Sequence, residues 1–310
     1  MKYCPITLEP IADENDFSTA GLQSFHPRLA TLDSLNLSQE EQLRQARLRA
    51  DKMSIQGVQP KLSAILKLKD GKFEVVDRGG RFILKPNPPL FREVPANEAL
   101  TMTMASKVGI NVPPHGLIPS IDGSWIYVIR RFDREARNRR LHVEDFAQLS
   151  GATRETKYES SLERVAKIIE NFCTFPALEK PKLARLLLFC FLTGNEDMHL
   201  KNFSLLVQKG VVKLSPAYDL LNTTLVLENA REESALTLNG RKRKLTREHW
   251  IEGFCQDRLQ LSEQQTESIL RDFQTAVPNW HASIDRSYLS KSQKKSYLQI
   301  LDERCTRLEL

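Results

Sequence analysis

The chemistry of this 310-residue chain gathers in one short stretch, GNEDMHLKN, which runs from Gly194 to Asn202 directly after the apolar LLLFCFLT. A turn of glycine and asparagine would be enough to end a helix, since these residues satisfy the terminal carbonyls at little cost. Asp197 and Asn202 stand five residues apart, the spacing of a phosphoryl-transfer loop in which the acid activates an acceptor hydroxyl and the amide oxygen holds a metal ion. The stretch therefore predicts phosphoryl transfer.

Such a site needs a second acid and a lysine. Asp219 in AYDLL lies 17 residues after Asn202 and is placed to be the second, metal-bridging acid, although alone it could equally be an N-cap or turn residue. Lys85 ends the strand-like RFILK and would reach nucleotide phosphates, whereas a lone lysine at a strand end is usually solvated. Glu98 in ANEALTM opens a helix shortly afterwards and could pair with this lysine.

A phosphate loop is predicted in MSIQGVQPKLSAIL, which has one glycine where a G-x-G-x-x-G motif has three. Gly57 permits a backbone bend beside the strand that follows. Hydrogen-bond donors come from the polar side chains of Ser54, Gln56, Gln59 and Lys61. As an isolated motif this loop is a weak signal.

The elements that must position these residues fall into two parts. From about residue 54 to about residue 133, alternating apolar residues and tight turns predict a small antiparallel sheet that carries one helix, VPANEALTMTMASKVG. An exposed helix, SQEEQLRQARLRADKM, precedes this sheet. The predicted strands are KLSAILKLK, KFEVVDR, RFILK, HGLIPSI and SWIYVIRRF.

Beyond Arg140 the pattern is mostly helical, in LHVEDFAQLSG, SSLERVAKIIENFC, PKLARLLLFCFLTG, REHWIEGFCQ, SEQQTESILRDFQTAV and KKSYLQILDERCTRLEL. Two hairpins interrupt the helices, NFSLLVQKGVVKLSPAYD and ESALTLNGRKRKLT. We predict an α+β, bilobal, protein-kinase-like fold. Its parts would be an N-terminal extension (1–50), a β-rich N-lobe with the phosphate loop and lysine (51–135), and a larger helical C-lobe with the catalytic and metal-binding loops (136–310).

Composition narrows the class of protein. A net charge of +6 and a pI near 9.0 suit an anionic ligand or partner, or serve solubility alone. The absence of a long apolar run and of a signal-like N-terminus predicts a cytoplasmic protein with no membrane span. Five scattered cysteines without C-x-x-C spacing predict reduced thiols rather than disulfides or a zinc site.

Several motifs, in order along most of the chain, resemble the HipA-like serine/threonine kinases of bacterial toxin-antitoxin systems. They are SIQGVQPKLSAIL, FILKP, the NE of ANEA, RRFDR, GNEDMHLKNFSLL, SPAYDLLNT and LTLNG. Only about 50 residues precede Ser54, so the chain looks most like the short HipT-type kinases. The resemblance implies a bilobal kinase-related fold, ATP with Mg²⁺, and phosphorylation of a serine or threonine in a protein.

The resemblance also implies roles for individual residues. Asp197 would be the catalytic base, Asn202 and Asp219 the Mg²⁺ ligands, and Lys201 would approach the transferred phosphate, while His199 suits a structural hydrogen bond better than direct chemistry. The implied nucleotide-binding positions are Ser54, Ile55, Gln56, Gly57, Val58, Gln59 and Lys61 of the phosphate loop, Lys85 and Glu98, the linker Arg130, Arg131, Phe132 and Asp133, and His199.

Regulation and partners follow from the same resemblance. Ser54 matches the serine that family members autophosphorylate to draw the loop away from ATP, and a phosphate there would add about −1.5 to −2 charges. The implied substrate is a protein, an aminoacyl-tRNA synthetase. The implied partners are a small HipS-like or HipB-like antitoxin, with DNA contacted only through it.

Three alternatives stay open from the residues. The chain could be a catalytically silent pseudokinase that acts as a binding module, although the intact set of site residues speaks against it. It could be a small-molecule phosphotransferase, because such enzymes share the D-x-x-x-x-N spacing. The basic RKRK, Arg241 to Lys244, could be a solvated edge or a contact with an acidic partner.

Overall fold

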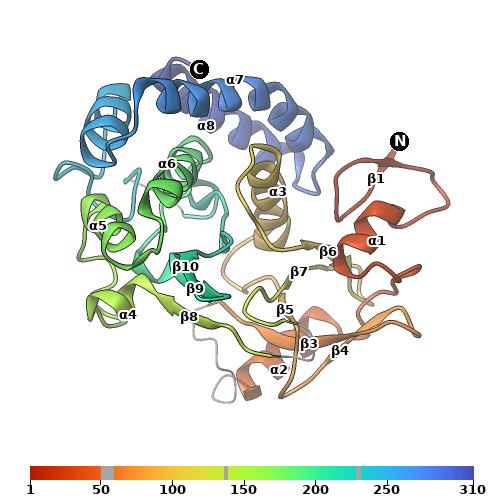
Figure 1. The fold of residues 1–310 in the computed structure, drawn as a ribbon. Helices are drawn as coiled ribbons and strands as arrows, with labels where there is room; N and C mark the ends of the chain where they lie inside the picture. Colours follow the sequence, from red (N-terminus) through yellow and green to blue (C-terminus); the bar gives the residue numbers. More distant parts are fainter. Residues whose placement is uncertain (50–58, 136–138, 228–231) are drawn as a thin grey trace. The chain divides into compact units, whose positions relative to one another are not determined.

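The structure, a computed structural model, describes residues 1–49, 59–135, 139–227 and 232–310 (Figure 1). The chain divides into two compact units that are each built from three segments. Unit 1 comprises Met1–Thr103, Pro113–Arg139 and Ser283–Ser290, and unit 2 comprises Met104–Val112, Arg140–Ala282 and Lys291–Leu310.

Unit 1 is built on a five-stranded sheet in the order β4-β3-β5-β7-β6, in which each neighbouring pair is antiparallel. Glycines in left-handed backbone, Gly71 and Gly123, form the tight turns that join β3 to β4 and β6 to β7. The five strands predicted from alternation are thereby confirmed. They are β3 (Leu62–Lys67), β4 (Lys72–Val75), β5 (Phe82–Lys85), β6 (His115–Pro119) and β7 (Trp125–Arg130).

An apolar core covers one side of this sheet. The rings of Phe25, Phe73 and Phe82 meet edge to face, with centroids 5.0 to 5.9 Å apart. Phe25 belongs to α1 (Thr19–Phe25), and α2 (Gln39–Arg49) adds the buried Ala46. The short strands β1 (Lys2–Tyr3) and β2 (Pro10–Ile11) pair ahead of them, within the predicted N-terminal extension.

Helix α3 (Val94–Lys107) follows β5 and is buried along most of its length. The side-chain oxygen of Asn87 accepts a hydrogen bond from the backbone N–H of Val94 at 3.0 Å, which satisfies one of the free donors at the start of the helix. Both apolar and acidic residues of this helix, including Leu100 and Glu98, lie inside the protein. The helix predicted here is confirmed.

Unit 2 is mostly helical (Figure 1). Its larger helices are α5 (Leu162–Phe172), α6 (Pro176–Leu192), α7 (Glu263–Arg286) and α8 (Lys291–Leu308), and the predicted REHWIEGFCQ forms a π-helix, η5 (His249–Arg258). Between α6 and η5 lie β9 (Ser204–Gln208) and β10 (Val211–Leu214), which form the first predicted hairpin and the sheet β10-β9-β8. The rings of Phe189 and Phe273 pack on Trp280 in the core.

Two predictions were wrong. LHVEDFAQLSG is not one helix, because β8 (His142–Asp145) pairs with β9 and α4 (Phe146–Ser150) begins only after Asp145. The Asp145 carboxylate accepts from the Gln148 backbone N–H, and the Gln148 side chain accepts from the Asp145 backbone N–H, which together form a capping box. Within the described range 232–310, the second predicted hairpin forms no pair of strands. One bridge joins Leu238 and Arg241 across the Asn239-Gly240 turn, and a further backbone bond, from the Glu233 N–H to the Lys242 carbonyl at 2.7 Å, is out of register with it.

The described residues bear on two sequence observations. All five cysteines are free and buried. Among the helices of the described ranges, none is both long and apolar enough to cross a membrane.

Candidate active site

In unit 1, Lys85 and Glu98 form a buried ion pair. The Lys85 Nζ lies 2.5 Å from a carboxylate oxygen of Glu98, and the two side chains are 4% and 1% exposed. Lys85 ends β5 opposite Tyr127 of β7, and its ammonium lies 5.5 Å from the centre of that ring. The end of β5 and the first turns of α3 thus fix the Lys85 ammonium inside the protein.

The linker residues predicted to lie against the nucleotide begin at the last residue of β7. Arg131 donates two hydrogen bonds to the carboxylate of Asp133, at 2.8 and 2.6 Å, and Arg134 lies 3.2 Å from the same group. Burial pushes the pKa of Asp133 upward, but the hydrogen bonds and charges of the two arginines outweigh it and leave the pKa below its ordinary value. Arg130 ends the strand, and Phe132 is half-buried between the paired residues.

Most of the predicted phosphate loop, Ser54 to Val58, lies outside the described residues. Gln59 and Lys61 are described, and both are half-buried immediately before β3. Their roles stay a prediction.

In unit 2, the loop GNEDMHLKN begins where α6 ends. Gly194 has a φ of +66°, and a Cβ there would come within 2.9 Å of the Asn222 side-chain oxygen, so the position requires glycine. Thr223 holds the loop from the other side: its hydroxyl accepts from the Glu196 N–H at 2.7 Å and donates to the Gly194 carbonyl at 3.2 Å. A polar segment distant in sequence therefore fixes the start of the loop.

The side chain of Asn202 contacts the backbone of Asp197. The Asn202 side-chain N–H donates to the Asp197 carbonyl at 2.7 Å, and the backbone N–H of His199 donates to the same oxygen at 2.8 Å. The Asn202 amide nitrogen is thereby committed to the protein. Its amide oxygen, a ligand type that Mg²⁺ accepts, is turned away from that bond.

Asp197 presents a carboxylate that is held by a tyrosine. Tyr158 donates from its hydroxyl to one carboxylate oxygen at 2.6 Å, and its ring meets the His199 ring edge to face at 4.9 Å. The Lys157 Nζ lies 2.7 Å from Nε2 of His199. Sequence reasoning missed both Lys157 and Tyr158.

Asp219 approaches the same loop through its neighbour. The Tyr218 hydroxyl lies 3.0 Å from the Lys201 carbonyl, to which it donates, and 2.6 Å from the Ser204 hydroxyl. Asp219 itself has a φ of +57°, a backbone that aspartate tolerates better than most residues. The structure thus ties the segment of the second predicted metal ligand to the loop that carries the first.

The electrostatics show that the charged groups of unit 2 act on one another. Burial lowers the pKa of His199, and the charges of Asp197 and Asp219 raise it only in part. Burial likewise lowers the pKa of Lys157, which feels the same two carboxylates. Lys201 is held 2.9 Å from Asp145, the cap of α4, and this acid was also missed from the sequence.

The predicted donor residues would suit Mg²⁺ held together with a nucleotide better than a metal site made by protein side chains alone. Within the described ranges, no three or more His, Cys, Asp or Glu residues gather as a metal-binding group. Asp219 and Asn202 offer a carboxylate and an amide oxygen, which are ligand types that Mg²⁺ accepts when phosphate oxygens and waters supply the rest.

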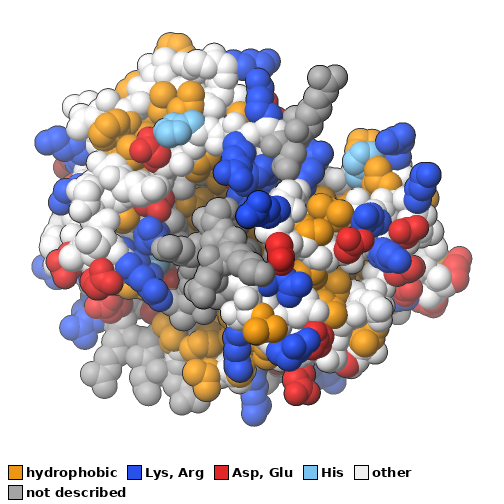
Figure 2. Space-filling view, turned by 90° about the horizontal axis from the view of Figure 1, so that it is seen from below, with side chains coloured by type: hydrophobic (Ala, Val, Ile, Leu, Met, Phe, Trp, Pro, Cys, Tyr) orange, Lys and Arg blue, Asp and Glu red, His pale blue; other side chains and the backbone are white. Residues whose placement is uncertain are grey.

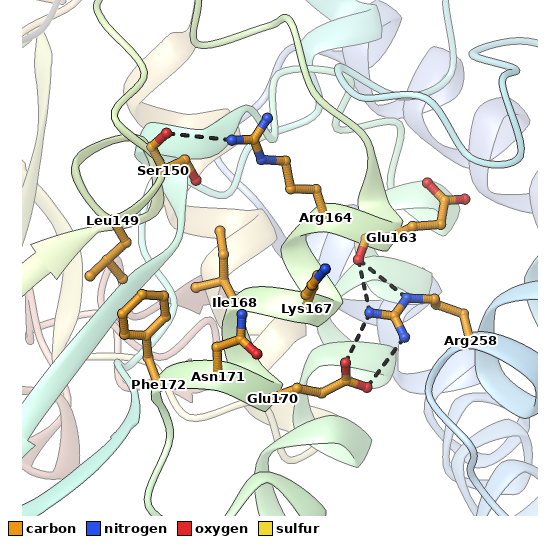
Figure 3. A pocket seen from close by; sticks show the side chains of 10 residues that line it. All are labelled: Leu149, Ser150, Glu163, Arg164, Lys167, Ile168, Glu170, Asn171, Phe172 and Arg258. Carbon is orange, nitrogen blue, oxygen red and sulfur yellow. Dashed lines mark hydrogen bonds and ion pairs between the residues drawn. The ribbon is translucent and has the colours of Figure 1, made fainter.

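A hollow of about 820 Å³ elsewhere in unit 2 contains no predicted site residue (Figure 3). Arg258 spans it with two hydrogen bonds to the Glu170 carboxylate, at 3.3 and 3.0 Å, and two to the Glu163 carbonyl, so its guanidinium is satisfied by the chain. Arg164 and Lys167 are exposed at its rim. The hollow does not contain the groups that phosphoryl transfer needs.

The face of the protein drawn in Figure 2 carries many Lys and Arg side chains with fewer acids among them. This agrees with the net charge of +6. Scattered basic groups of this kind attract anionic ligands without selecting among them.

Comparison with protein families gives a match over most of the chain. The model of the HipA-like C-terminal domain matches residues 53–280. The matched range includes the predicted phosphate loop and each of the predicted site residues that follow it.

Three proteins are similar to this chain in amino-acid sequence. A Haemophilus influenzae protein named "Putative kinase" is 32% identical over 268 residues, which cover 77% of this chain and 76% of the relative. "Putative kinase Y4dM" of Sinorhizobium fredii is 34% identical over 66% of this chain and 53% of its own. The "Serine/threonine-protein kinase toxin HipA" of Shewanella oneidensis is 26% identical over 61% and 47%, so the alignment spans about half the length of the last two relatives.

Two solved structures share the fold. Shewanella oneidensis HipA, solved with HipB and operator DNA, has a TM-score of 0.69 at 21% identity, covering 96% of this chain and 79% of its own. The Helicobacter pylori proinflammatory kinase CtkA has a TM-score of 0.54 at 16% identity, covering 73% and 86%. At these identities the likeness shows the fold alone, and it confirms the predicted α+β kinase-like fold.

Proposed function

The chain belongs to the HipA-like C-terminal domain family, and from this premise we propose that it is an ATP- and Mg²⁺-dependent serine/threonine protein kinase of a toxin-antitoxin system. The observation that carries the proposal is the loop at Asp197. It combines an anchored carboxylate with an asparagine whose amide nitrogen is bound to the protein and whose oxygen has no hydrogen bond to any described residue.

Each group has a role in phosphoryl transfer. Asp197 accepts the proton of the acceptor hydroxyl, and Lys85, held by Glu98, binds nucleotide phosphates. Asn202 and Asp219 hold Mg²⁺, which when bound neutralises charge on the phosphates. The proposal assigns nucleotide contacts also to the loop from Ser54 to Lys61 and to the linker from Arg130 to Asp133.

His199 and Lys201 support this loop in different ways. The Lys157 ammonium can only donate, so the Nε2 of His199 accepts and its proton stays on Nδ1. That Nδ1 is buried and, within the described part of the chain, has no hydrogen-bond partner. A phosphate oxygen of the nucleotide would satisfy this donor, which supports the predicted place of His199 in the nucleotide site. Lys201, now paired with Asp145, would turn to the transferred phosphate.

Substrate and partners are proposed from the family. The substrate is an aminoacyl-tRNA synthetase, and the partner is a small HipB-like or HipS-like antitoxin through which the chain contacts DNA. Shewanella oneidensis HipA forms a complex with HipB and operator DNA, which supports the antitoxin part of the proposal. Ser54 is proposed as the autophosphorylation site that silences the enzyme, because a phosphate there would repel those of ATP.

A transfer assay tests the proposal and its alternatives. Labelled ATP and Mg²⁺ are incubated with a bacterial lysate and with the native protein, Asp197→Ala, or the control Asp257→Ala, which removes an exposed acid of unit 2. We expect a labelled protein band with the native chain and the control, and its loss in Asp197→Ala. Label on a small molecule would indicate a phosphotransferase of metabolites, whereas no transfer despite ATP binding would indicate a binding module.

The same samples test the self-limiting serine. Mass spectrometry of the native protein after incubation with ATP is expected to find phosphate on Ser54. Phosphate found elsewhere, with Ser54 unmodified in an active preparation, would contradict this part of the proposal.

A further inference from the structure

The carboxylate of Asp197 depends on one hydroxyl. Within the described residues its side chain has one hydrogen bond, the 2.6 Å contact between the Tyr158 hydroxyl and the oxygen Oδ1. Tyr158 lies in the segment between α4 and α5, 39 residues earlier in the chain. The second carboxylate oxygen of Asp197, Oδ2, has no hydrogen bond to any described residue.

Two contacts hold the ring of Tyr158, and a third anchors its neighbour Lys157. The tyrosine ring packs edge to face on His199, and the Lys157 ammonium lies 4.9 Å from its ring centre while it bonds the same histidine. The backbone N–H of Leu200 donates to the Lys157 carbonyl at 3.3 Å. The segment of Tyr158 is therefore anchored on the loop that it supports.

The protonation of this pair is clear. Burial raises the pKa of Tyr158, and the hydrogen bond to Asp197 with its negative charge raises it further, so the phenol keeps its proton. It can donate that proton in a charge-assisted bond, which is shorter and stronger than a bond between neutral groups. Although Tyr158 is 40% exposed, its side chain therefore has a defined orientation.

We infer that Tyr158 is a positioning residue, which fixes the rotamer of Asp197 so that Oδ2 points to the acceptor hydroxyl. The inference rests on the proposed function, since it presumes that Asp197 is the base. At sites that activate a hydroxyl, a third group commonly orients the base that accepts the hydroxyl proton. Lys157 and His199 act one step further out, because they fix the tyrosine ring.

The same contact has an opposite explanation. The Tyr158 hydroxyl could occupy the place of the acceptor hydroxyl and block it. The two explanations differ in sign: removing a positioning hydroxyl slows transfer, whereas removing a block speeds it.

The variant Tyr158→Phe separates them, because it deletes the hydroxyl and keeps the ring that packs on His199. The initial rate of transfer from labelled ATP to lysate protein is measured at varied ATP, together with the melting temperature. We expect the apparent kcat to fall roughly 10- to 100-fold, the loss of one hydrogen bond to a charged group, with an unchanged KM for ATP and unchanged melting. The matched control Tyr288→Phe removes a tyrosine hydroxyl that donates to the Tyr3 carbonyl in unit 1, and it should transfer at the native rate.

The double variant Tyr158→Phe/Asp197→Asn completes the test. Since the tyrosine acts through Asp197, it should reduce the residual rate of Asp197→Asn no further, measured by mass spectrometry over long incubations. A native or faster rate in Tyr158→Phe would overturn the inference, as would an equal loss in both backgrounds, which would indicate a general structural effect. If Asp197→Asn itself transfers at the native rate, the proposed function fails instead, and the inference falls with it.

Discussion

The Lys85–Glu98 pair of unit 1 and the Asp197 loop of unit 2 hold their charges in different ways. The pair joins a strand end to a helix and is almost fully buried. Asp197 is half-buried on an irregular loop, where its carboxylate and backbone are bound by Tyr158, Asn195 and Asn202. Regular elements and packing place the first charge, whereas side chains from scattered parts of the chain place the second.

This difference suggests a division between stability and chemistry. A buried ion pair is costly to break, because the remaining charge stays uncompensated in a medium of low polarity. A half-buried carboxylate keeps contact with water and with an incoming hydroxyl, so removing it should change the reaction more than the fold. Substitutions in both units can test this division.

Breaking the buried pair should have the largest effect on stability. Lys85→Ala leaves the Glu98 carboxylate buried with its lysine gone, and we expect the free energy of unfolding to fall by about 3–5 kcal/mol. The double variant Lys85→Met/Glu98→Leu should recover most of this loss while transfer from ATP stays absent. Denaturant titration of the native protein and the two variants measures the free energy of unfolding. A loss below about 1 kcal/mol in Lys85→Ala would show that the pair is not a stabilising element.

His115 in unit 1 and His199 in unit 2 extend the comparison of the two units to the pH dependence of stability. Burial lowers the pKa of His115 in unit 1 to about 4 from 6.5, with a smaller opposing contribution from its hydrogen bond to the Pro113 carbonyl. Between these values the unfolded chain binds more protons than the folded one, so stability is complete above pH 6.5 and falls as the pH drops toward 4.

The full loss from this group should reach about 3 kcal/mol below pH 4. His115→Gln should remove that part of the pH dependence, seen as a flatter curve of unfolding free energy against pH than in the native protein. In His199 the nearby carboxylates oppose the effect of burial, so His199→Gln should flatten the curve less. Equal slopes in native protein and His115→Gln would contradict the assignment.

The smallest effect is expected at the cap that joins β8 to α4. Asp145 accepts from the Gln148 N–H at 2.8 Å and pairs with Lys201, so Asp145→Ala should cost about 1–2 kcal/mol. Gln148→Ala removes only the reciprocal hydrogen bond and should cost less. Thermal unfolding compares them, and identical melting of both variants would contradict the larger role assigned to the Asp145 carboxylate.

The sequence could reveal residues on regular elements. Alternation placed Lys85 at a strand end and helical periodicity placed Glu98, and their separation allowed the pair to be proposed. Asp197 and Asn202 were found from their spacing alone. The α+β kinase-like fold followed from the order of these elements.

Contacts between irregular segments could not be predicted. Tyr158 and Lys157 reach Asp197 and His199 across 39 and 42 residues, and no periodicity marks them. The strand β8 was missed because four residues give too short an alternation. Its end was nevertheless readable, since Asp145 followed three residues later by Gln148 is a capping-box pattern.

The most direct test of the central claim measures ATP affinity and phosphate transfer in the same preparation of Asp197→Asn. This variant keeps the shape of the side chain and removes its charge and basicity. If Asp197 supplies chemistry, transfer should fall by roughly 10²- to 10⁴-fold while the affinity for ATP with Mg²⁺ changes little. Transfer at the native rate would contradict the claim, and so would a parallel loss of binding and transfer, which would make Asp197 a residue of the fold or the nucleotide site.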